Sequence, residues 1–302
     1  MKIGFSAPVS GSWATRENLV HVARRAEELG YHSLWAFQRL LSPVDGSWGQ
    51  TYRSVLDPIA VLAHLAAHTS RIRLGIAVLN LPFAAPVLVA KQLTTVDLVS
   101  DGRLDAGLGL GWADEEFTAV GVSAAARGRR ADEYVPLLRS LLHDDVVEHH
   151  GEFYEVPRSS VRPGPVQSPL PILLGGAAEP ALRRVGRLAD GWVSSSRADL
   201  TVLGDSVRVV REAAEQAGRD PASLRFVCRG AVRLRDGLGA DRAPLTGSVE
   251  QIRSDLPLLA EQGVTELFLD PNFDDRIGSP DADPAESMRR AEELLGGLAP
   301  TG

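Results

Sequence analysis

Short apolar segments alternate with amphipathic segments along almost the whole chain. The apolar segments are typical of strands and cover residues 2–7, 32–37, 72–80, 104–111, 171–176, 191–196, 224–234 and 264–270. Between them, apolar residues recur three and four positions apart, which is the spacing of an amphipathic helix. Helices are therefore predicted over residues 16–30, 57–69, 86–100, 179–189, 200–218, 248–263 and 284–298, and helical segments over about 113–144. Boundary residues support this pattern, because Asp57 and Pro58 suit a helix start and Gly30 suits a helix end.

The order of these segments predicts one closed barrel. Strands that alternate with helices pair in parallel, because each helix returns the chain to the starting edge of the sheet. Eight such units are the number that closes a (β/α)8 barrel, the TIM barrel of the α/β class. The alternation breaks at about residues 145–170, where a hairpin is expected to turn near Gly151 before a proline-rich stretch. No linker divides the chain, so we expect a single domain over residues 1–302 with a hairpin insertion at about 145–170.

Composition and charge narrow the classes of partner. The chain has 302 residues and a formal net charge of -7, and its basic residues are scattered, which argues against nucleic acid as the main partner. Cys228 is the single cysteine, so the chain can form neither an internal disulfide nor a thiolate metal site. No apolar run approaches the ~20 residues of a membrane helix, and the chain starts directly with a strand. We expect a soluble cytoplasmic protein with a small-molecule substrate and no membrane partner.

Candidate chemistry is expected at the carboxyl ends of the barrel strands, where TIM-barrel active sites lie. Residues 175–176 are a Gly-Gly pair before a helix, and free N–H groups with the positive end of a helix dipole favour phosphate there. A tight turn that requires glycine is the alternative. Gln38 and Arg39 end the second strand, where an arginine suits a carboxylate, a phosphate or a ring carbonyl, or a plain surface ion pair. His64 and His68 lie on an outer helix without the glutamate of a metalloprotease motif, so no metal site is predicted.

The stretch from Arg103 to Phe117 carries glycine at positions 107, 109 and 111. Side chains alternate across a strand, so these glycines form one bare face that a flat or bulky group can approach. The spacing does not satisfy the Rossmann fingerprint, which requires a glycine where Trp112 or Ala113 stands. The acids at 114–116 favour a helix N-terminus and are expected to be solvated. No nucleophile elbow or convergent carboxylate pair is present, so hydrolysis is poorly supported.

Three segments resemble the bacterial luciferase-like monooxygenase superfamily, specifically its branch of oxidoreductases that depend on the deazaflavin coenzyme F420. They read ELGYHSLWAFQRLL, IRLGIAVLNLPFAAPVLVAKQLTTVDLVSDGRLDAGLGLGWADEEFTAVGV and PILLGGAAEPALRRVGRLADGW. They occur in this order at spacings that fit a barrel, and the resemblance covers nearly the whole chain.

The resemblance implies a cofactor ring in the barrel mouth, against a bulge that contains a non-proline cis peptide at Ala77-Val78. It implies a polar contact at Asn80, a further contact at residues 110–111 and a phosphate loop at 175–178. The complete set of expected cofactor-binding residues is Gln38, Arg39, Ala77, Val78, Asn80, Leu110, Gly111, Gly175, Gly176 and Ala178.

Two positions depart from relatives in this superfamily. Many relatives end the second strand in Asp-His, where this chain has Gln38 and Arg39. The sugar-phosphate dehydrogenases place a glutamate after Gly-x-Gly, where this chain has Trp112. Both acid–base groups of that branch are missing, so no catalytic acid is assigned. Arg39 and Gln38 are the best catalytic candidates, since an arginine can stabilise negative charge on a reduced ring.

The function that the resemblance implies is hydride transfer between F420 and a small organic substrate whose identity the sequence does not give. Alternatives are an FMN-dependent monooxygenase that uses reduced FMN and oxygen, a non-catalytic flavin-binding barrel, and an aldolase- or hydrolase-type barrel. A homodimer is expected by family analogy. Five aromatic residues lie in or beside the mouth loops and suggest an apolar pocket, with plain core as the alternative reading: Trp13, Trp48, Tyr52, Trp112 and Phe273.

Overall fold

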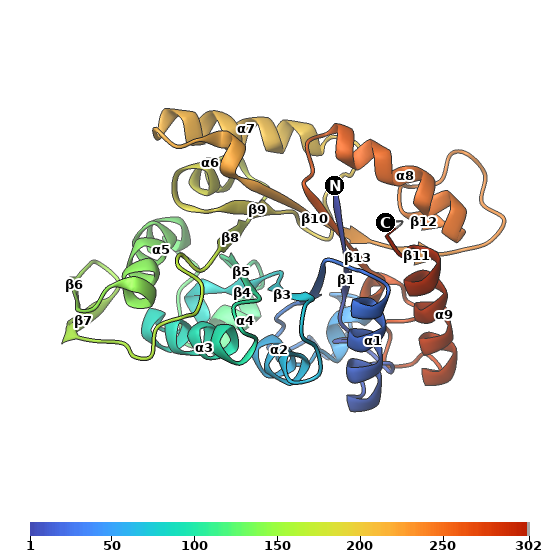
Figure 1. The fold of residues 1–302 in the computed structure, drawn as a ribbon, viewed down its shortest axis with the longest axis horizontal. Coiled ribbons are helices and arrows are strands. Elements are labelled where there is room, and N and C mark those ends of the chain that lie inside the picture. The colour runs from blue at the N-terminus through green and yellow to red at the C-terminus, as the bar shows by residue number, and fades with distance from the viewer. Residues whose placement is uncertain (301–302) are drawn as a thin grey trace.

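A ring of eight parallel strands forms the centre of the molecule in the computed structural model, which describes residues 1–300 (Figure 1). In ring order the strands lie β3-β2-β1-β13-β10-β9-β8-β5, and pairing of β3 with β5 closes the ring. The predicted TIM barrel and its eight strand segments are confirmed. The strands are β1 (Lys2–Ser6), β2 (Ser33–Ala36), β3 (Arg73–Ile76), β5 (Leu104–Gly109), β8 (Ile172–Gly175), β9 (Gly191–Val193), β10 (Arg225–Ala231) and β13 (Glu266–Asp270).

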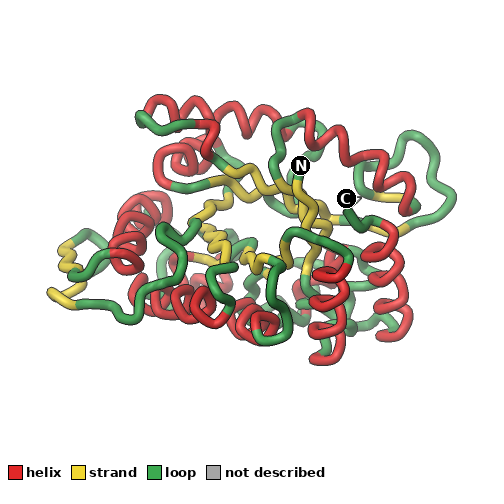
Figure 2. The backbone as a smooth tube through the Cα atoms, in the orientation of Figure 1, coloured by secondary structure: helices red, strands yellow, loops and turns green. Residues whose placement is uncertain are grey.

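Helices surround the strands on the outside (Figure 2). The predicted N-cap is confirmed, because the side chain of Asp57 accepts a hydrogen bond from the backbone N–H of Ala60. Within residues 1–300, no helix has the length and apolar character needed to cross a membrane. The principal helices are α1 (Arg16–Glu28), α2 (Pro58–Ala66), α3 (Pro86–Val99), α5 (Arg127–His143), α6 (Glu179–Leu188), α7 (Leu203–Gln216), α8 (Val249–Glu261) and α9 (Pro284–Gly297).

The helical segments predicted at about 113–144 are two helices, α4 (Asp114–Ala119) and α5, because Gly121 adopts a φ of 71° that ends the first. One predicted helix boundary was wrong. The helix expected from residue 200 starts only at Leu203. There, the carboxylate of Asp199 accepts hydrogen bonds from the backbone N–H and hydroxyl of Thr201. Such a local turn competes with helix formation.

The hairpin predicted at about 145–170 is confirmed as β6 (Val147–His150) paired antiparallel with β7 (Glu155–Ser159). It projects from the barrel beside α5 (Figure 1). Glu133 on α5 fixes its turn, because this carboxylate accepts hydrogen bonds from the backbone N–H groups of Phe153 and Tyr154. Two further strands lie within predicted strand segments: β4 (Leu79–Asn80) in 72–80, where it continues β3, and β11 (Arg233–Leu234) in 224–234. The short strand β12 (Thr246–Gly247), which pairs with β11, was not predicted.

A buried ionic cluster fills the barrel at the amino ends of the strands. Asp105 is fully buried and accepts hydrogen bonds from Arg73 at 2.7 Å and Arg225 at 2.6 Å. Arg225 also donates to Glu266 at 2.9 Å. Burial by itself raises the pKa of Asp105, but the hydrogen bonds from the two arginines outweigh it and hold this pKa below its ordinary value. The cluster therefore favours the ionised carboxylate in the folded state.

This shift predicts an acid-dependent loss of stability. Because the folded pKa of Asp105 is depressed, its contribution is complete above the unfolded value of about 3.9 and is lost as pH falls through the lower folded value. We expect the free energy of unfolding, measured by urea denaturation, to fall more steeply below about pH 4 in the wild type than in Asp105→Asn. Equal slopes in the two proteins would show that Asp105 does not contribute.

Candidate active site

The floor of the barrel mouth is apolar. Six buried side chains pack inside the ring, and among them the rings of Trp35 and Phe268 are stacked with centroids 5.1 Å apart. Val78 packs on this cluster and is only partly buried. Val78 is therefore the apolar side chain that covers this cluster on the side of the strands' carboxyl ends. The six buried members are Trp35, Ala77, Leu173, Val193, Val227 and Phe268.

The peptide bond between Ala77 and Val78 is cis, as the sequence resemblance predicted. It lies between β3 and β4, which both pair with β5. Gly75 is opposite Asp105 and Leu79 is opposite Leu108. Between these two pairs, the segment that runs from β3 to β4 therefore contains one residue more than the facing part of β5. This extra residue makes the expected bulge at the end of the third barrel strand.

The alternating glycines of β5 make room for this bulge. A Cβ atom at Gly107 would lie 1.9 Å from the carbonyl oxygen of Ile76, and one at Gly109 would lie 2.4 Å from Cγ2 of Val78. Both distances are far below a tolerable contact, so only glycine fits. The bare face predicted from the sequence exists, and the group that approaches it is the bulge itself.

Hydrogen bonds from three directions hold the bulge. The N–H of Ala77 donates to the carbonyl of Ala36 at 2.8 Å. The N–H of Asn80 donates to Oε1 of Gln38 at 2.9 Å. Arg229 donates from Nη1 to the carbonyl of Ala77 at 3.0 Å. The structure thus brings together three predicted site residues, Gln38, Asn80 and Ala77, with Gln38 supporting the backbone of the bulge.

Arg39 lies beside these residues but is held by a carboxylate. Its Nη1 donates to Oε2 of Glu116 at 2.9 Å, and the other oxygen of Glu116 accepts the N–H of Leu40 at 2.7 Å. The expectation that residues 114–116 are solvated was wrong for Glu116, which is fully buried by this pairing, whereas Asp114 and Glu115 are exposed. Burial lowers the pKa of Arg39, and the charge of Glu116 opposes that shift.

Aromatic rings enclose Arg39 on its remaining sides. The guanidinium carbon lies 4.8 Å from the ring centroids of Tyr52 and Trp112 and 5.3 Å from that of Trp48. Tyr52 also packs against Phe273 with centroids 5.7 Å apart. Three of the five predicted mouth aromatics therefore surround this arginine, and a fourth, Phe273, packs behind Tyr52. The fifth, Trp13, is completely buried and belongs to the core.

The predicted phosphate loop joins β8 to α6. Ala178 is the N-cap residue of α6, and it makes no side-chain cap hydrogen bond in the described chain. Residues 177–178 are exposed. Gly176 has a φ of 158°, and its carbonyl accepts a hydrogen bond from the indole of Trp192 at 2.8 Å. An uncapped and accessible helix start of this kind suits an anionic group.

The last predicted pair, Leu110 and Gly111, follows β5. Gly111 has a φ of 74°, and a Cβ there would lie 3.0 Å from the ring of Phe117. Leu110 is half-buried and packs against the main core. The two residues connect the glycine strand to α4 and so link the bulge to Glu116.

Sequence reasoning missed Arg229, near the carboxyl end of β10. Its Nε donates to Oδ2 of Asp270 at 2.7 Å, and both residues are buried. A signal was available: β10 alternates Arg225, Val227 and Arg229, and residues two apart share one face of a strand. Charged residues on the face that also carries a core valine indicate a buried polar site.

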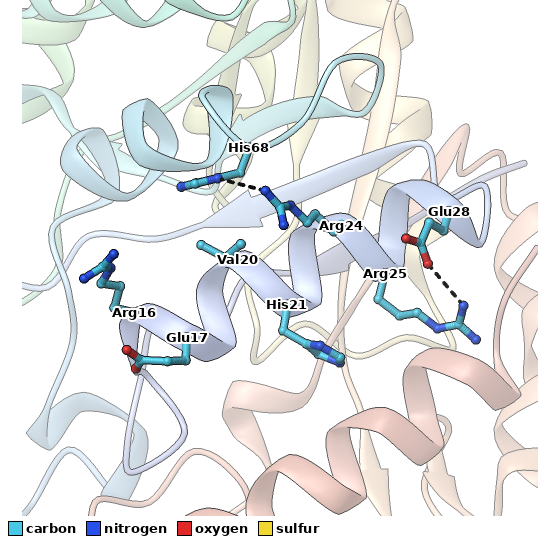
Figure 3. Close-up of a pocket in the computed structure, with 8 residues that line it drawn as sticks. All are labelled: Arg16, Glu17, Val20, His21, Arg24, Arg25, Glu28 and His68. Carbon is cyan, nitrogen blue, oxygen red and sulfur yellow. Dashed lines mark hydrogen bonds and ion pairs between the residues drawn. The ribbon is translucent and has the colours of Figure 1, made fainter.

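A cavity lies outside the barrel wall, against α1 (Figure 3). It has a volume of about 570 Å³ and is lined mainly by charged side chains of α1, with Val20 as its apolar member. His68 lies at its edge, with Nδ1 3.5 Å from Nη2 of Arg24. His64 and His68 therefore sit on the outer layer, with ring centroids 4.7 Å apart. Within residues 1–300, no three His, Cys, Asp or Glu side chains gather as metal ligands.

The barrel, its bulge and the uncapped loop define a class of protein. The chain belongs to the luciferase-like monooxygenase family, whose model matches residues 2–265. Members of this superfamily are oxidoreductases and monooxygenases that depend on flavin or F420.

Individual relatives agree with this assignment. The uncharacterized protein Rv0940c of Mycobacterium tuberculosis is 30% identical over 288 residues, which cover 91% of this chain and 92% of that protein. The structure of monooxygenase RslO1 from Streptomyces bottropensis superposes with a TM-score of 0.79 at 23% identity, over 99% of this chain and 98% of that one. An F420-dependent secondary alcohol dehydrogenase, in complex with an F420-acetone adduct, superposes with a TM-score of 0.77 at 16% identity, over 98% of each chain.

Proposed function

We propose that this chain binds coenzyme F420 in the barrel mouth and uses it in the oxidation or reduction of a small organic substrate. The observation that carries the proposal is the adjacency of an apolar floor and an anion-binding loop. A Cβ at Gly175 would lie 3.2 Å from Cγ1 of Val78, so the loop that leads to the uncapped start of α6 begins beside the floor. A flat ring with a phosphate-bearing tail requires this juxtaposition.

The residues present fit such a cofactor. Val78 would support the ring, residues 110–111 and Asn80 would orient it, and residues 175–178 would bind the phosphate. When bound, F420 would supply a two-electron hydride carrier that resists reaction with oxygen. The aromatic side chains around Arg39 would exclude water from the mouth and form an apolar substrate pocket.

The preference for F420 over FMN is supported by charge at the rim. Arg197 is exposed, and its guanidinium carbon lies 5.4 Å from the ring centroid of Trp112. It forms no ion pair with the described residues. The longer, acidic tail of F420 suits a free cation at this place. The resemblance to the luciferase-like family supports the further proposal that this protein is a homodimer.

An FMN-dependent monooxygenase is the second candidate. The observation that favours it is the uncapped helix start at α6 beside the apolar floor, since one phosphate needs no more than this loop. In that case reduced FMN would come from a separate reductase, and oxygen would be a substrate.

Fluorescence titration of the purified protein with F420 and, separately, with FMN tests the proposal. We expect a micromolar dissociation constant for F420 and at least roughly tenfold weaker binding of FMN, which is a difference of about 1.4 kcal/mol. A preference for FMN would favour the monooxygenase candidate. Binding of neither cofactor would overturn the proposed function.

Ala178→Asp makes this titration specific for the phosphate loop. An aspartate N-cap is expected to stabilise α6 by about 1 kcal/mol, while its charge repels the phosphate and weakens binding by roughly tenfold or more. Ala85→Asp is the matched control, because Ala85 is the uncapped N-cap residue of α3. It should give a similar gain in stability without loss of affinity. Equal affinities in the two variants would contradict a phosphate site at residue 178.

A further inference from the structure

Arg229 is enclosed near the carboxyl end of β10. Its side chain is 9% exposed, with Nε on Asp270 at 2.7 Å and Nη1 on the carbonyl of Ala77 at 3.0 Å. The guanidinium carbon lies 4.4 Å from the ring centroid of Phe37 and 4.6 Å from that of Phe273. Protein groups thus fix the position of the guanidinium next to the bulge.

The Nη2 atom of Arg229 is buried without a hydrogen-bond partner among the described residues. Arg225, four residues earlier on the same face of β10, differs from it in this respect. Its Nη1 donates to Asp105 and its Nη2 donates to both Asp105 and Glu266. A buried donor left unpaired costs about 1 to 3 kcal/mol. An unmet donor of this kind at a candidate site therefore indicates a missing acceptor.

Asp270 cannot release Arg229 easily, because it is fixed from a second side. Its Oδ1 accepts hydrogen bonds from the backbone N–H of Asn272 at 3.1 Å and from Nδ2 of Asn272 at 2.9 Å. Oδ1 of Asn272 in turn accepts the N–H groups of Val9 and Ser10. The cation is therefore held in place before any ligand arrives, which is the arrangement that stabilises charge with least reorganisation.

We propose that Nη2 of Arg229 binds a negatively charged oxygen of a ligand in the barrel mouth. This inference rests on the proposed function and adds a ligand-binding cation that donates at a defined atom. Two sources supply such an oxygen: a ring carbonyl of the cofactor, which gains negative charge on reduction, or a carboxylate or alkoxide of the substrate. Neighbouring side chains shield Nη2 from solvent, so ligand binding has to move one of them. Phe273 is only half-buried and has more freedom than Phe37.

The first experiment asks whether the oxygen belongs to the cofactor. The reduction midpoint potential of F420 bound to the wild type, Arg229→Met and Arg229→Lys is measured by spectroscopic titration. If Arg229 binds a ring oxygen, Arg229→Met weakens binding of reduced F420 tenfold more than that of oxidised F420. This ratio equals a shift of about 30 mV to more negative potential. Arg229→Lys should recover part of the shift, because it keeps the charge.

Arg127→Met is the control for loss of positive charge near the mouth. Arg127 is exposed, and its Nη1 donates to the carbonyl of Gly111 at 3.3 Å. Its removal should affect both redox forms of the cofactor equally, so the midpoint potential should stay at the wild-type value. An equal shift in Arg127→Met and Arg229→Met would assign the effect to general charge and would overturn the proposal for the cofactor ring.

The second experiment asks whether the oxygen belongs to the substrate, with benzoate and acetate as carboxylate probes. If the oxygen belongs to the substrate, benzoate raises the melting temperature of the wild type and of Arg229→Lys, but not that of Arg229→Met. In that case Arg229→Met leaves the midpoint potential of bound F420 unchanged. If Arg229→Met does not fold, Arg229→Gln is measured in the same two ways, because it keeps a donor without the charge.

The outcomes separate this inference from the proposed function. If the wild type binds F420 and Arg229→Met matches it in both experiments, Nη2 is satisfied by a structural water only and the inference is overturned. If the wild type binds neither F420 nor FMN, the proposed function fails. The benzoate measurement then decides alone whether Arg229 binds a ligand oxygen.

Discussion

Glu116→Ala is expected to lower the free energy of unfolding by about 3 to 5 kcal/mol, because it leaves the charge of Arg39 buried and unpaired. Glu116 is fully buried, and the side chain of Arg39 is only 7% exposed. The substitution also removes the acceptor for the N–H of Leu40. Both losses act on the segment that follows β2, so we expect the aromatic side chains around Arg39 to lose their fixed positions.

Urea denaturation of Glu116→Ala and Glu115→Ala measures this effect. Glu115 precedes Glu116 in α4 but is exposed, so its replacement should change the free energy of unfolding by no more than about 0.5 kcal/mol. Glu116→Gln should fall between the two variants, since an amide keeps an acceptor for Arg39 but carries no charge. If Glu116→Ala were as stable as Glu115→Ala, the ion pair would have no structural role.

Gly107→Ala is expected to destabilise the protein by about 3 kcal/mol and to abolish cofactor binding. The added Cβ would lie 1.9 Å from the carbonyl oxygen of Ile76. That oxygen belongs to the backbone immediately before Ala77, so relief of the contact must displace the bulge. A displaced bulge moves Val78 away from its place in the floor of the mouth. It also breaks the hydrogen bond from Arg229 to the Ala77 carbonyl. Stability and F420 affinity should therefore fall together.

Gly296→Ala is the matched control for this substitution. Gly296 lies in α9, where an added Cβ meets no atom within 4 Å, and alanine is favoured over glycine in a helix by about 0.5 to 1 kcal/mol. Gly296→Ala should therefore raise the free energy of unfolding and leave F420 affinity unchanged. Wild-type affinity in Gly107→Ala would contradict the role of the glycine face in positioning the bulge.

The fold was predictable from the sequence because the barrel is built from local repeats. Each strand is apolar and each helix is amphipathic, and their boundaries carry capping residues such as Asp57. The helix start predicted at residue 200 was wrong because Asp199 and Thr201 form a local turn, which the spacing of apolar residues does not show. The place where the segment 113–144 divides depends on Gly121, and a glycine in a helical pattern does not by itself distinguish a break from a tolerated residue.

The candidate site was predictable only in part, since its key contacts join distant residues. Glu116 was expected in solvent because its neighbours favour a helix N-terminus, yet its partner Arg39 is 77 positions away. Arg229 contacts Ala77 across 152 positions, and no local pattern encodes that pairing. The bulge was located because a resemblance to a family supplied its position. The glycines alone showed that space was required, and the structure identified Ile76 and Val78 as the residues that fill it.

The distribution of indole rings gives this molecule an optical reporter of its own. Trp13, Trp35 and Trp192 are at most 2% exposed, so their emission should be insensitive to events in the solvent. Trp112 is 46% exposed and lies 5.0 Å, between ring centroids, from Trp48. A chromophore that enters the mouth would lie beside these two indoles and quench their emission. Entry of a coloured cofactor could thus be timed by stopped flow on the unmodified chain, without a label.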